Sequence, residues 1–359
     1  MRHGAAIHVT SILILKTGAL GDVLRTTSIL PGLHERFPDA RVEWLTAPAA
    51  RQLVDGHPLV ARTHLWRAVD AALAAELRGQ RWDWVLSLDD EEPLCRLASG
   101  LDAATLSGAH IDPTGERAYT DDVAPWFDMG LLSRLGKAEA DRLKIANERS
   151  HPAIYADMFG VAMGRPELPV PSSAIASTEA RLPKETLAQR SRWIGLNTGA
   201  GGRWTSKQLP EERTLELAQR LHTAANGDVG FVVLGGPDEA PRNARLVGAL
   251  AGEGLAVIDA GTDNSLLEFA AIVDRLDLLV TSDSLALHIA IARSVPIVSF
   301  FSPTSAAEIE LYGLGEAVRS TAPDYCSYRP DADNATVTAE RLAAAVGRVL
   351  GSTAGRIRE

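Results

Sequence analysis

Short apolar runs alternate along this chain with longer stretches in which hydrophobic and polar residues recur at helical spacing. The apolar runs have the continuous Val, Ile and Leu content of strands that are buried on both faces. They predict strands at residues 12–16, 41–46, 83–88, 193–197, 230–234, 255–259, 278–282 and 297–301. The periodic stretches predict helices at residues 26–36, 68–78, 138–144 and 339–350, the last after a cap at Thr338. Strands that alternate with helices indicate an α/β fold with parallel sheets.

Two domains are expected, because 359 residues exceed what one hydrophobic core usually supports. Residues 164–173, with three prolines and no apolar periodicity, predict the linker between them. Each half opens with a buried strand that runs into a glycine-bearing turn, first ILILKTGALGD and then WIGLNTGAGGRW. We therefore predict two Rossmann-like domains that face each other across a cleft, over residues 1–170 and 171–335. A C-terminal helix and tail would follow over residues 336–359, with packing on the N-terminal domain as one option.

The charge and cysteine content exclude several classes of function. A formal net charge of −10 and a pI near 5.5 leave no broad basic surface for nucleic acid, and a small anionic ligand would need a local positive site. The two cysteines, Cys95 and Cys326, are too few for a disulfide framework and fit a reducing, cytoplasmic setting. No apolar run approaches the ~20 residues of a membrane-spanning helix, and residues 1–10 do not resemble a secretory signal.

The first candidate motif is KTGALGDVLRTT at residues 16–27. Its glycines, Gly18 and Gly21, permit a tight turn from strand to helix, and Asp22 stands where the helix begins. Asp22 can project from the carboxyl end of the strand into the cleft and take a proton from an attacking hydroxyl. It can equally be an N-cap that satisfies exposed helix N–H groups, and these residues by themselves favour the cap.

The second candidate is a glycine-rich loop, NTGAGGRWTSKQLP, at residues 197–210. Such a loop exposes backbone N–H groups, and with Lys207 nearby it can neutralise a diphosphate. It lacks the ending of a Walker A loop, and it lacks the dinucleotide fingerprint of a nicotinamide dehydrogenase. The alternative is a flexible connection between strand and helix with a solvated lysine.

Two further motifs follow predicted strands. In TSDSLALHIAIA, Asp283 and Ser284 come just after an apolar strand, and His288 stands on the first turns of the next helix, where helix N–H groups face an incoming anion. In LGGPDE, Glu239 follows paired glycines and can accept hydrogen bonds from ribose hydroxyls. The alternatives are a packed histidine and a solvated turn. No His, Cys and carboxylate cluster has convincing metal spacing, and no Gly-x-Ser-x-Gly elbow indicates a hydrolase.

In this order and at these separations, the four motifs resemble those of glycosyltransferase family 9, the ADP-heptose:lipopolysaccharide heptosyltransferases and their relatives. The resemblance spans most of the chain. It implies a GT-B fold with an acceptor-binding N-terminal domain and a C-terminal domain that binds an ADP-sugar. It also implies inversion at the anomeric carbon without a metal or other cofactor. A sugar, with ADP-heptose as the donor, would pass to a hydroxyl of a glycan, glycolipid, protein or small molecule, with peripheral membrane contact as one option.

The resemblance also implies roles for single residues. Asp22 matches the general base proposed for the family, with Lys16, Gly18 and Arg25 on the acceptor side. Lys207 matches the lysine that contacts the donor phosphate, and Glu239 matches the acid near the nucleoside. The whole donor-binding set is Thr198, Gly199, Ala200, Gly201, Lys207, Glu239, Asp283, Ser284 and His288.

The chain departs from the family pattern at several points. Leu285 stands where many members have a glycine, and Gln208 follows the lysine where tryptophan is common. The cysteine-rich iron motif of some relatives is reduced here to Cys326, so no bound metal is expected. Two alternatives stay open: a sugar-nucleotide epimerase or hydrolase with a similar donor half, and a non-catalytic relative that binds a nucleotide-sugar.

Residues 108–147 break the pattern of strands and helices, with mixed charge and the large side chains Trp126, Phe127 and Met129, and they suggest an insertion over the cleft. A net negative chain would need a local basic rim to approach an anionic glycolipid. The candidates for that rim are Arg25, Lys137, Arg142 and Lys144.

Overall fold

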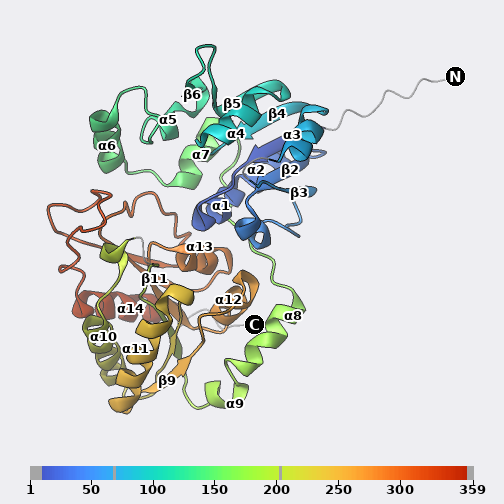
Figure 1. The fold of residues 1–359 in the computed structure, drawn as a ribbon. Helices are drawn as coiled ribbons and strands as arrows, with labels where there is room; N and C mark the ends of the chain where they lie inside the picture. The colour runs from blue at the N-terminus through green and yellow to red at the C-terminus, as the bar shows by residue number, and fades with distance from the viewer. Residues whose placement is uncertain (1–9, 68–69, 202–203, 354–359) are drawn as a thin grey trace. The chain divides into compact units, whose positions relative to one another are not determined.

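The structure of the chain is a computed structural model that describes residues 10–67, 70–201 and 204–353 (Figure 1). It divides into two compact units, Met1–Glu167 and Leu168–Glu359, and the division falls inside the proline-bearing stretch 164–173. Each unit has its own sheet, and helices connect the strands of each sheet. Among the described residues, no helix is both long and apolar enough to cross a membrane.

The described part of the N-terminal unit contains a six-stranded sheet in the order β3-β2-β1-β4-β5-β6. Its strands are β1 Ser11–Leu15, β2 Arg41–Thr46, β3 Arg62–Leu65, β4 Arg81–Ser87, β5 Asp102–Ile111 and β6 Arg117–Tyr119. Neighbouring strands are parallel except for β5 and β6, which are antiparallel. Ile12 of β1 is in register with Val42 of β2 and with Trp84 of β4. A central strand flanked in this way is buried on both faces, which explains its uninterrupted apolar sequence.

Helices and short 3₁₀ turns connect these strands. They are α1 Leu20–Thr26, η1 Thr27–Ile29, α2 Leu30–Arg36, η2 Pro48–Leu53, α3 Ala71–Arg78, α4 Glu92–Ser99, η3 Asp121–Val123, α5 Ala124–Phe127, α6 Lys137–Ala146 and α7 His151–Phe159. Trp82, Leu94 and Leu97 are among the buried side chains that join α3 and α4 to the sheet in one apolar cluster. The stretch suggested as an insertion, residues 108–147, belongs to this unit and contains β6, α5 and α6.

The described part of the C-terminal unit repeats the same architecture, with a six-stranded sheet in the order β12-β11-β10-β7-β8-β9. Its strands are β7 Trp193–Asn197, β8 Gly230–Val233, β9 Ala256–Asp259, β10 Leu278–Ser282, β11 Ile297–Phe301 and β12 Gly315–Arg319, and all neighbours are parallel. Read from its other edge, and counted from β7, this is the order 3-2-1-4-5-6 that the first sheet also has. That order is the one found in dinucleotide-binding Rossmann folds.

The helices of the C-terminal unit are α8 Ser172–Ser177, η4 Thr178–Ala180, α9 Lys184–Leu187, η5 Thr205–Lys207, α10 Glu211–Ala224, η6 Pro237–Glu239, α11 Ala240–Gly252, α12 Leu266–Val273, α13 Leu285–Ala292 and α14 Ala339–Thr353. In Figure 1, α10, α11 and α14 lie together beside the sheet. Leu342, Val346 and Val349 of α14 are buried in the core of the C-terminal unit, so the C-terminal helix is part of that core. Residues 354–359 of the predicted tail lie outside the described residues.

The predicted α/β fold and the two Rossmann-like domains are confirmed. The eight predicted strands are present near their predicted bounds, and the Thr338 cap is present, with its Oγ1 accepting from the N–H of Arg341 at 3.2 Å. Four strands were missed, because β3, β5, β6 and β12 lack a continuous apolar run.

Two helix bounds were wrong. The helix predicted over residues 26–36 begins six residues earlier, at Leu20, and a 3₁₀ turn interrupts it before α2, which has a proline in its first turn. The helix predicted over 68–78 begins at Ala71, because Asp70 caps it by accepting from the N–H of Leu73 at 3.0 Å. The first two residues of that prediction, 68 and 69, lie outside the described residues.

Candidate functional site

The predicted site residues gather at equivalent points of the two sheets. In each sheet the strand order reverses beside the first strand, between β1 and β4 in one unit and between β7 and β10 in the other. Loops that leave the carboxyl ends of strands at such a point form a crevice where open α/β sheets bind ligands. The KTGALGD turn leaves β1, the NTGAG turn leaves β7 and the TSDS turn ends β10. Each unit therefore has one candidate crevice, and the two are described separately.

At the switch point of the N-terminal sheet, Lys16 and Asp89 form an ion pair. Lys16 directly follows β1, Asp89 comes two residues after β4, and both are buried. The Lys16 ammonium pairs with one oxygen of Asp89, and the other oxygen accepts from Thr17 Oγ1 at 2.8 Å. Lys16 thus joins the ends of β1 and β4. Any ligand that bound the Lys16 ammonium would have to share it with Asp89. Sequence reasoning missed Asp89, although an acidic pair directly after a predicted strand was a usable signal.

Asp22 is the third residue of α1, and the N-cap of that helix is Ala19. The capping interpretation of Asp22 is therefore wrong. The Asp22 side chain is 38% exposed, and its Oδ1 lies 2.9 Å from Nη2 of Arg25, one turn further along the helix. Gly18 lies in the turn before α1, and a Cβ built on it meets no atom within 4 Å. The turn thus leaves room near its backbone, and the partly exposed Asp22 carboxylate follows it.

In the C-terminal unit, Glu239 holds the glycine-rich loop. Its carboxylate accepts from the N–H of Gly201, with N–Oε1 at 2.5 Å, and from the N–H of Gly236, with N–Oε2 at 2.8 Å. A Cβ on Gly199 would lie 2.4 Å from Cγ of Glu239, so only glycine allows this close approach. Gly201 has a φ of 67°, which also favours glycine. Glu239 therefore shapes the loop, and it would have to share its carboxylate to bind ribose hydroxyls.

Arg242, which sequence reasoning missed, holds the other side of this loop. Its Nη2 donates to Oγ1 of the buried Thr198 at 2.9 Å and to the carbonyl of Leu209 at 2.7 Å. The N–H of Leu209 in turn donates to the carbonyl of Thr198 at 3.0 Å. Burial lowers the pKa of the Arg242 guanidinium. The Thr198 hydroxyl is thus engaged inside the unit, and residues 202–203 of the loop lie outside the described residues.

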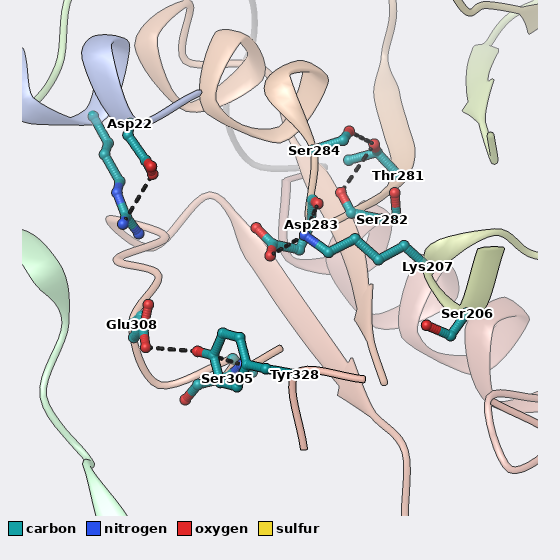
Figure 2. A network of polar contacts seen from close by, with 12 residues as sticks. Asp22, Ser206, Lys207, Thr281, Ser282, Asp283, Ser284, Ser305, Glu308 and Tyr328 are labelled. Carbon is teal, nitrogen blue, oxygen red and sulfur yellow. Dashed lines mark hydrogen bonds and ion pairs between the residues drawn. The ribbon is translucent and has the colours of Figure 1, made fainter. Parts of the chain in front are cut away.

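Lys207 and Asp283 form an ion pair at the switch point. Lys207 ends the turn η5, and Asp283 directly follows β10; Figure 2 shows the lysine side chain extending to the carboxylate. Lys207 Nζ donates to Oδ2 and to the carbonyl oxygen of Asp283, each at 2.9 Å. Burial tends to raise the pKa of Asp283, but Lys207 and His288 outweigh it and lower that pKa to about 2. The Asp283 carboxylate is therefore ionised at neutral pH, and its contacts hold the Lys207 Nζ at the switch point.

Ser284 and His288 belong to the same crevice. Ser284 is the N-cap of α13 and does not bond the helix N–H groups with its side chain. Its Oγ instead lies 3.2 Å from Oγ1 of Thr281 and 3.4 Å from Nδ2 of Asn197. His288 is buried on α13 and contributes to the low pKa of Asp283. The structure thus brings Lys207, Asp283, Ser284 and His288 together beside a helix N-terminus, an arrangement suited to an anion.

Asn334 positions the turn that carries Lys207, and no signal in the sequence indicated it. Its Nδ2 donates to the carbonyl of Ser206 at 3.2 Å and to the carbonyl of Gln208 at 2.8 Å, so it bonds both neighbours of Lys207. Arg213 donates through Nη1 to the carbonyl oxygen and to Oδ1 of Asn334 at 2.8 and 3.2 Å. The position of Lys207 therefore depends on a segment more than a hundred residues further along the chain.

A second polar network supports the same segment. The Tyr328 hydroxyl donates to Oε1 of the buried Glu308 at 2.7 Å, a contact drawn in Figure 2. Burial, together with the Glu308 carboxylate, raises the pKa of Tyr328 far above its ordinary value. Two residues after Tyr328, the carbonyl of Pro330 accepts from the N–H of Ser206 at 3.2 Å. This network ties the chain after β11 to the turn η5.

The candidate basic rim is largely neutralised by neighbouring carboxylates. Lys137 pairs with Asp141 and Arg142 with Glu139, each at 2.5 Å on the same helix, and Arg25 pairs with Asp22. Across the described ranges, no group of three or more His, Cys, Asp and Glu side chains could hold a metal ion. Cys95 and Cys326 are both buried and unbridged.

Comparisons with known proteins agree with this geometry. The sequence model described as glycosyltransferase family 9 (heptosyltransferase) matches residues 134–329, more than half of the chain. A glycosyl transferase family 9 structure from Veillonella parvula is 18% identical, covers 96% of this chain and 97% of its own, and superposes with a TM-score of 0.72. The ADP-heptose lps heptosyltransferase II of E. coli is 18% identical, with 96% and 100% coverage and a TM-score of 0.69. E. coli heptosyltransferase WaaC with ADP-2-deoxy-2-fluoro heptose is 15% identical, covers 96% of this chain and 100% of its own, and superposes with a TM-score of 0.58. A search of curated proteins gave no match.

Proposed function

This chain belongs to glycosyltransferase family 9, and we propose from that membership that it is an inverting enzyme that moves a heptose from ADP-heptose to a hydroxyl acceptor. The donor would bind in the C-terminal unit, and Asp22 of the N-terminal unit would act as general base. The similar structures of E. coli heptosyltransferases, one of them with an ADP-heptose analogue, support this choice of donor. The acceptor hydroxyl would belong to a glycan, a glycolipid, a protein or a small molecule.

The single observation that carries the proposal is the fixed cation of Lys207 at the switch point of the C-terminal sheet. A diphosphate bound there would meet the Lys207 ammonium, the N–H groups that begin α13 and the backbone of the loop 198–201. Glu239 and Arg242 hold that loop from two sides, so little reorganisation is needed on binding. Donors fixed in advance are the arrangement that best stabilises charge developing on a leaving group.

The reaction would be a single displacement. The acceptor oxygen attacks the anomeric carbon while the bond from that carbon to the diphosphate oxygen breaks, and ADP leaves with the bonding electron pair. The acceptor proton passes to the Asp22 carboxylate, and Lys207 stabilises the negative charge that grows on ADP. A general base of this kind contributes roughly 10²–10⁴-fold to the rate.

Asp283 would serve this reaction by positioning Lys207 rather than by touching phosphate. A carboxylate with a pKa of about 2 stays ionised at neutral pH and would repel a phosphate oxygen directly. Its hydrogen bonds to Lys207, however, hold the lysine Nζ at one point beside β10. Asn334 would act in the same way on the backbone of the turn η5.

Nucleotide binding tests the proposal, because a ligand that binds only the folded protein raises its apparent melting temperature. ADP, UDP, GDP, CDP and NAD would be compared on the native chain, on Lys207→Ala and on Lys184→Ala, an exposed lysine of the same unit that serves as the matched control. We expect ADP to stabilise the native chain and Lys184→Ala alike, and to lose much of its effect on Lys207→Ala. A response to UDP or GDP instead would exclude ADP-heptose as the donor.

Transfer itself needs a second measurement. With ADP-heptose and an acceptor, a glycosyltransferase releases ADP in step with glycosylated acceptor, whereas a sugar-nucleotide hydrolase releases ADP without an acceptor and an epimerase releases none. The open space at Gly18 supports binding of an acceptor in the N-terminal unit. Selective ADP binding without turnover across a broad acceptor screen would favour the non-catalytic alternative.

A further inference from the structure

Trp126 connects the stretch 108–147 to the residues around Asp22. It belongs to α5, and its ring lies under the guanidinium of Arg25, with Cζ 5.2 Å from the ring centroid. At that separation a cation is attracted to the face of an indole. Arg25 is the residue that pairs with Asp22, so a chain of two contacts leads from the indole to the carboxylate.

Trp126 is itself fixed by buried aromatic side chains of α7. Its ring meets His151 edge to face, at 4.8 Å and 90°, and Tyr155 at 5.6 Å and 85°. His151 and Tyr155 are both buried, and Tyr155 continues to the buried Phe159 at 5.6 Å and 79°. Aromatic packing of this kind leaves few alternative positions for a ring. The indole is thus a fixed support rather than a mobile surface group.

Arg25 differs from an ordinary surface partner of a carboxylate. An exposed pair three residues apart on a helix holds its side chains only loosely, because both keep many rotamers in water. Here the Arg25 side chain is 13% exposed, and its guanidinium has the indole below it and the carboxylate oxygen 2.9 Å away. A planar guanidinium held in this way presents its N–H groups in one direction. The Asp22 carboxylate, 38% exposed, therefore meets a donor whose position is already set.

We propose that Arg25 and Trp126 are positioning residues that orient the Asp22 carboxylate for proton transfer, and this inference rests on the proposed role of Asp22 as the base. It assigns a purpose to the stretch 108–147, which delivers Trp126 to the side of α1. A base must lie within hydrogen-bond reach of the acceptor proton, so an unfixed carboxylate would lower turnover more than it lowers binding. The effect should therefore fall on kcat and not on the affinity for the nucleotide.

The test compares Trp126→Leu, Trp126→Phe and Arg25→Gln in transfer assays at saturating donor and acceptor, with ADP affinity measured on each variant. We expect Trp126→Leu and Arg25→Gln to lower kcat by about three- to thirtyfold, the range of a partly buried cation–π contact, with unchanged ADP affinity. Trp126→Phe keeps an aromatic face and should recover much of the loss. Unchanged kcat in both Trp126→Leu and Arg25→Gln would overturn the inference.

Trp84 provides the matched control. It packs edge to face on Phe159 at 5.8 Å and lies under another arginine, Arg36, at 5.8 Å, so Trp84→Leu removes comparable contacts from the same unit without touching Arg25. We expect Trp84→Leu to lower the melting temperature and to leave kcat unchanged. A fall in kcat equal to that of Trp126→Leu would mean that both losses come from general loosening, and it would overturn the inference.

A double-mutant cycle with Asp22→Asn separates this inference from the proposed function. If Arg25 and Trp126 act through Asp22, then Arg25→Gln and Trp126→Leu add nothing to the loss that Asp22→Asn causes by itself. Losses that multiply would show independent action and refute the inference while Asp22 remains the base. Full turnover of Asp22→Asn alone would refute the proposed base, and the positioning role with it. The melting temperature of each variant shows whether it is folded. Trp126→Phe is the mildest of these substitutions.

Discussion

The ion pair between Lys207 and Asp283 makes a quantitative prediction for the variant Asp283→Asn. The pKa of this carboxyl moves from its ordinary 3.8 to about 2, and a shift of that size corresponds to about 2 kcal/mol at about 1.4 kcal/mol per pKa unit. Both side chains are less than one fifth exposed, so solvent screens the pair only in part. The amide should therefore lower the stability of the C-terminal unit at pH 7 by about 2 kcal/mol.

Thermal unfolding at a series of pH values measures this difference. For a unit of this size about 2 kcal/mol corresponds to roughly 4–8 °C in the melting temperature. Because the pKa of the folded state is lowered, the stabilisation is complete above the ordinary pKa and is lost as the pH falls toward 2. The gap between the native chain and Asp283→Asn should thus stay constant from pH 8 to pH 5 and narrow only below about pH 4. Asp331→Asn, in an exposed pair with Arg329, is the control and should change the melting temperature little.

Two results would refute this reasoning. A gap that already changes strongly between pH 8 and pH 5 would mean that His288 contributes more than Lys207 to the stabilisation of the carboxylate. Tighter binding of ADP by Asp283→Asn would mean that the carboxylate competes with phosphate for Lys207. We expect weaker binding, because Lys207 loses the partner that fixes its Nζ.

Three further variants test single contacts. Asp22→Asn should reduce turnover by roughly 10²–10⁴-fold and leave ADP affinity nearly intact, as measured by steady-state kinetics and calorimetry; normal turnover would exclude it as the base. Gly199→Ala places a Cβ 2.4 Å from Cγ of Glu239, so the loop must shift and ADP affinity should fall, whereas an unchanged affinity would show that the loop is adaptable. Asn334→Ala removes hydrogen bonds on both sides of Lys207 and should weaken ADP binding more than it lowers the melting temperature; equal affinity would exclude a positioning role.

Much of the fold was readable from local sequence. The strands β7, β10 and β11 are short, fully buried and apolar, so their composition alone gave their bounds. Edge and polar strands such as β3 and β12 were not readable, because what makes them strands is pairing with a neighbour far away in the sequence. Asp22 does lie at the start of a helix, but its interpretation as the N-cap failed for a related reason, since the exact residue at which a helix begins depends on backbone geometry that local sequence does not specify.

The sequence by itself placed these residues in the segments that follow predicted strands: Asp22 after one strand of the first half, and Lys207, Asp283 and His288 after two strands of the second. Such segments leave the carboxyl ends of parallel strands, where open α/β sheets bind ligands. Only the tertiary structure decided which of them touch. It paired Lys207 with Asp283, and it also paired Lys16 with an unforeseen partner, Asp89. It placed the Asn334 amide against the turn that carries Lys207, and the Trp126 indole under Arg25. Such contacts join segments about 70 to more than 120 residues apart, and short-range periodicity carries no information about packing at that separation.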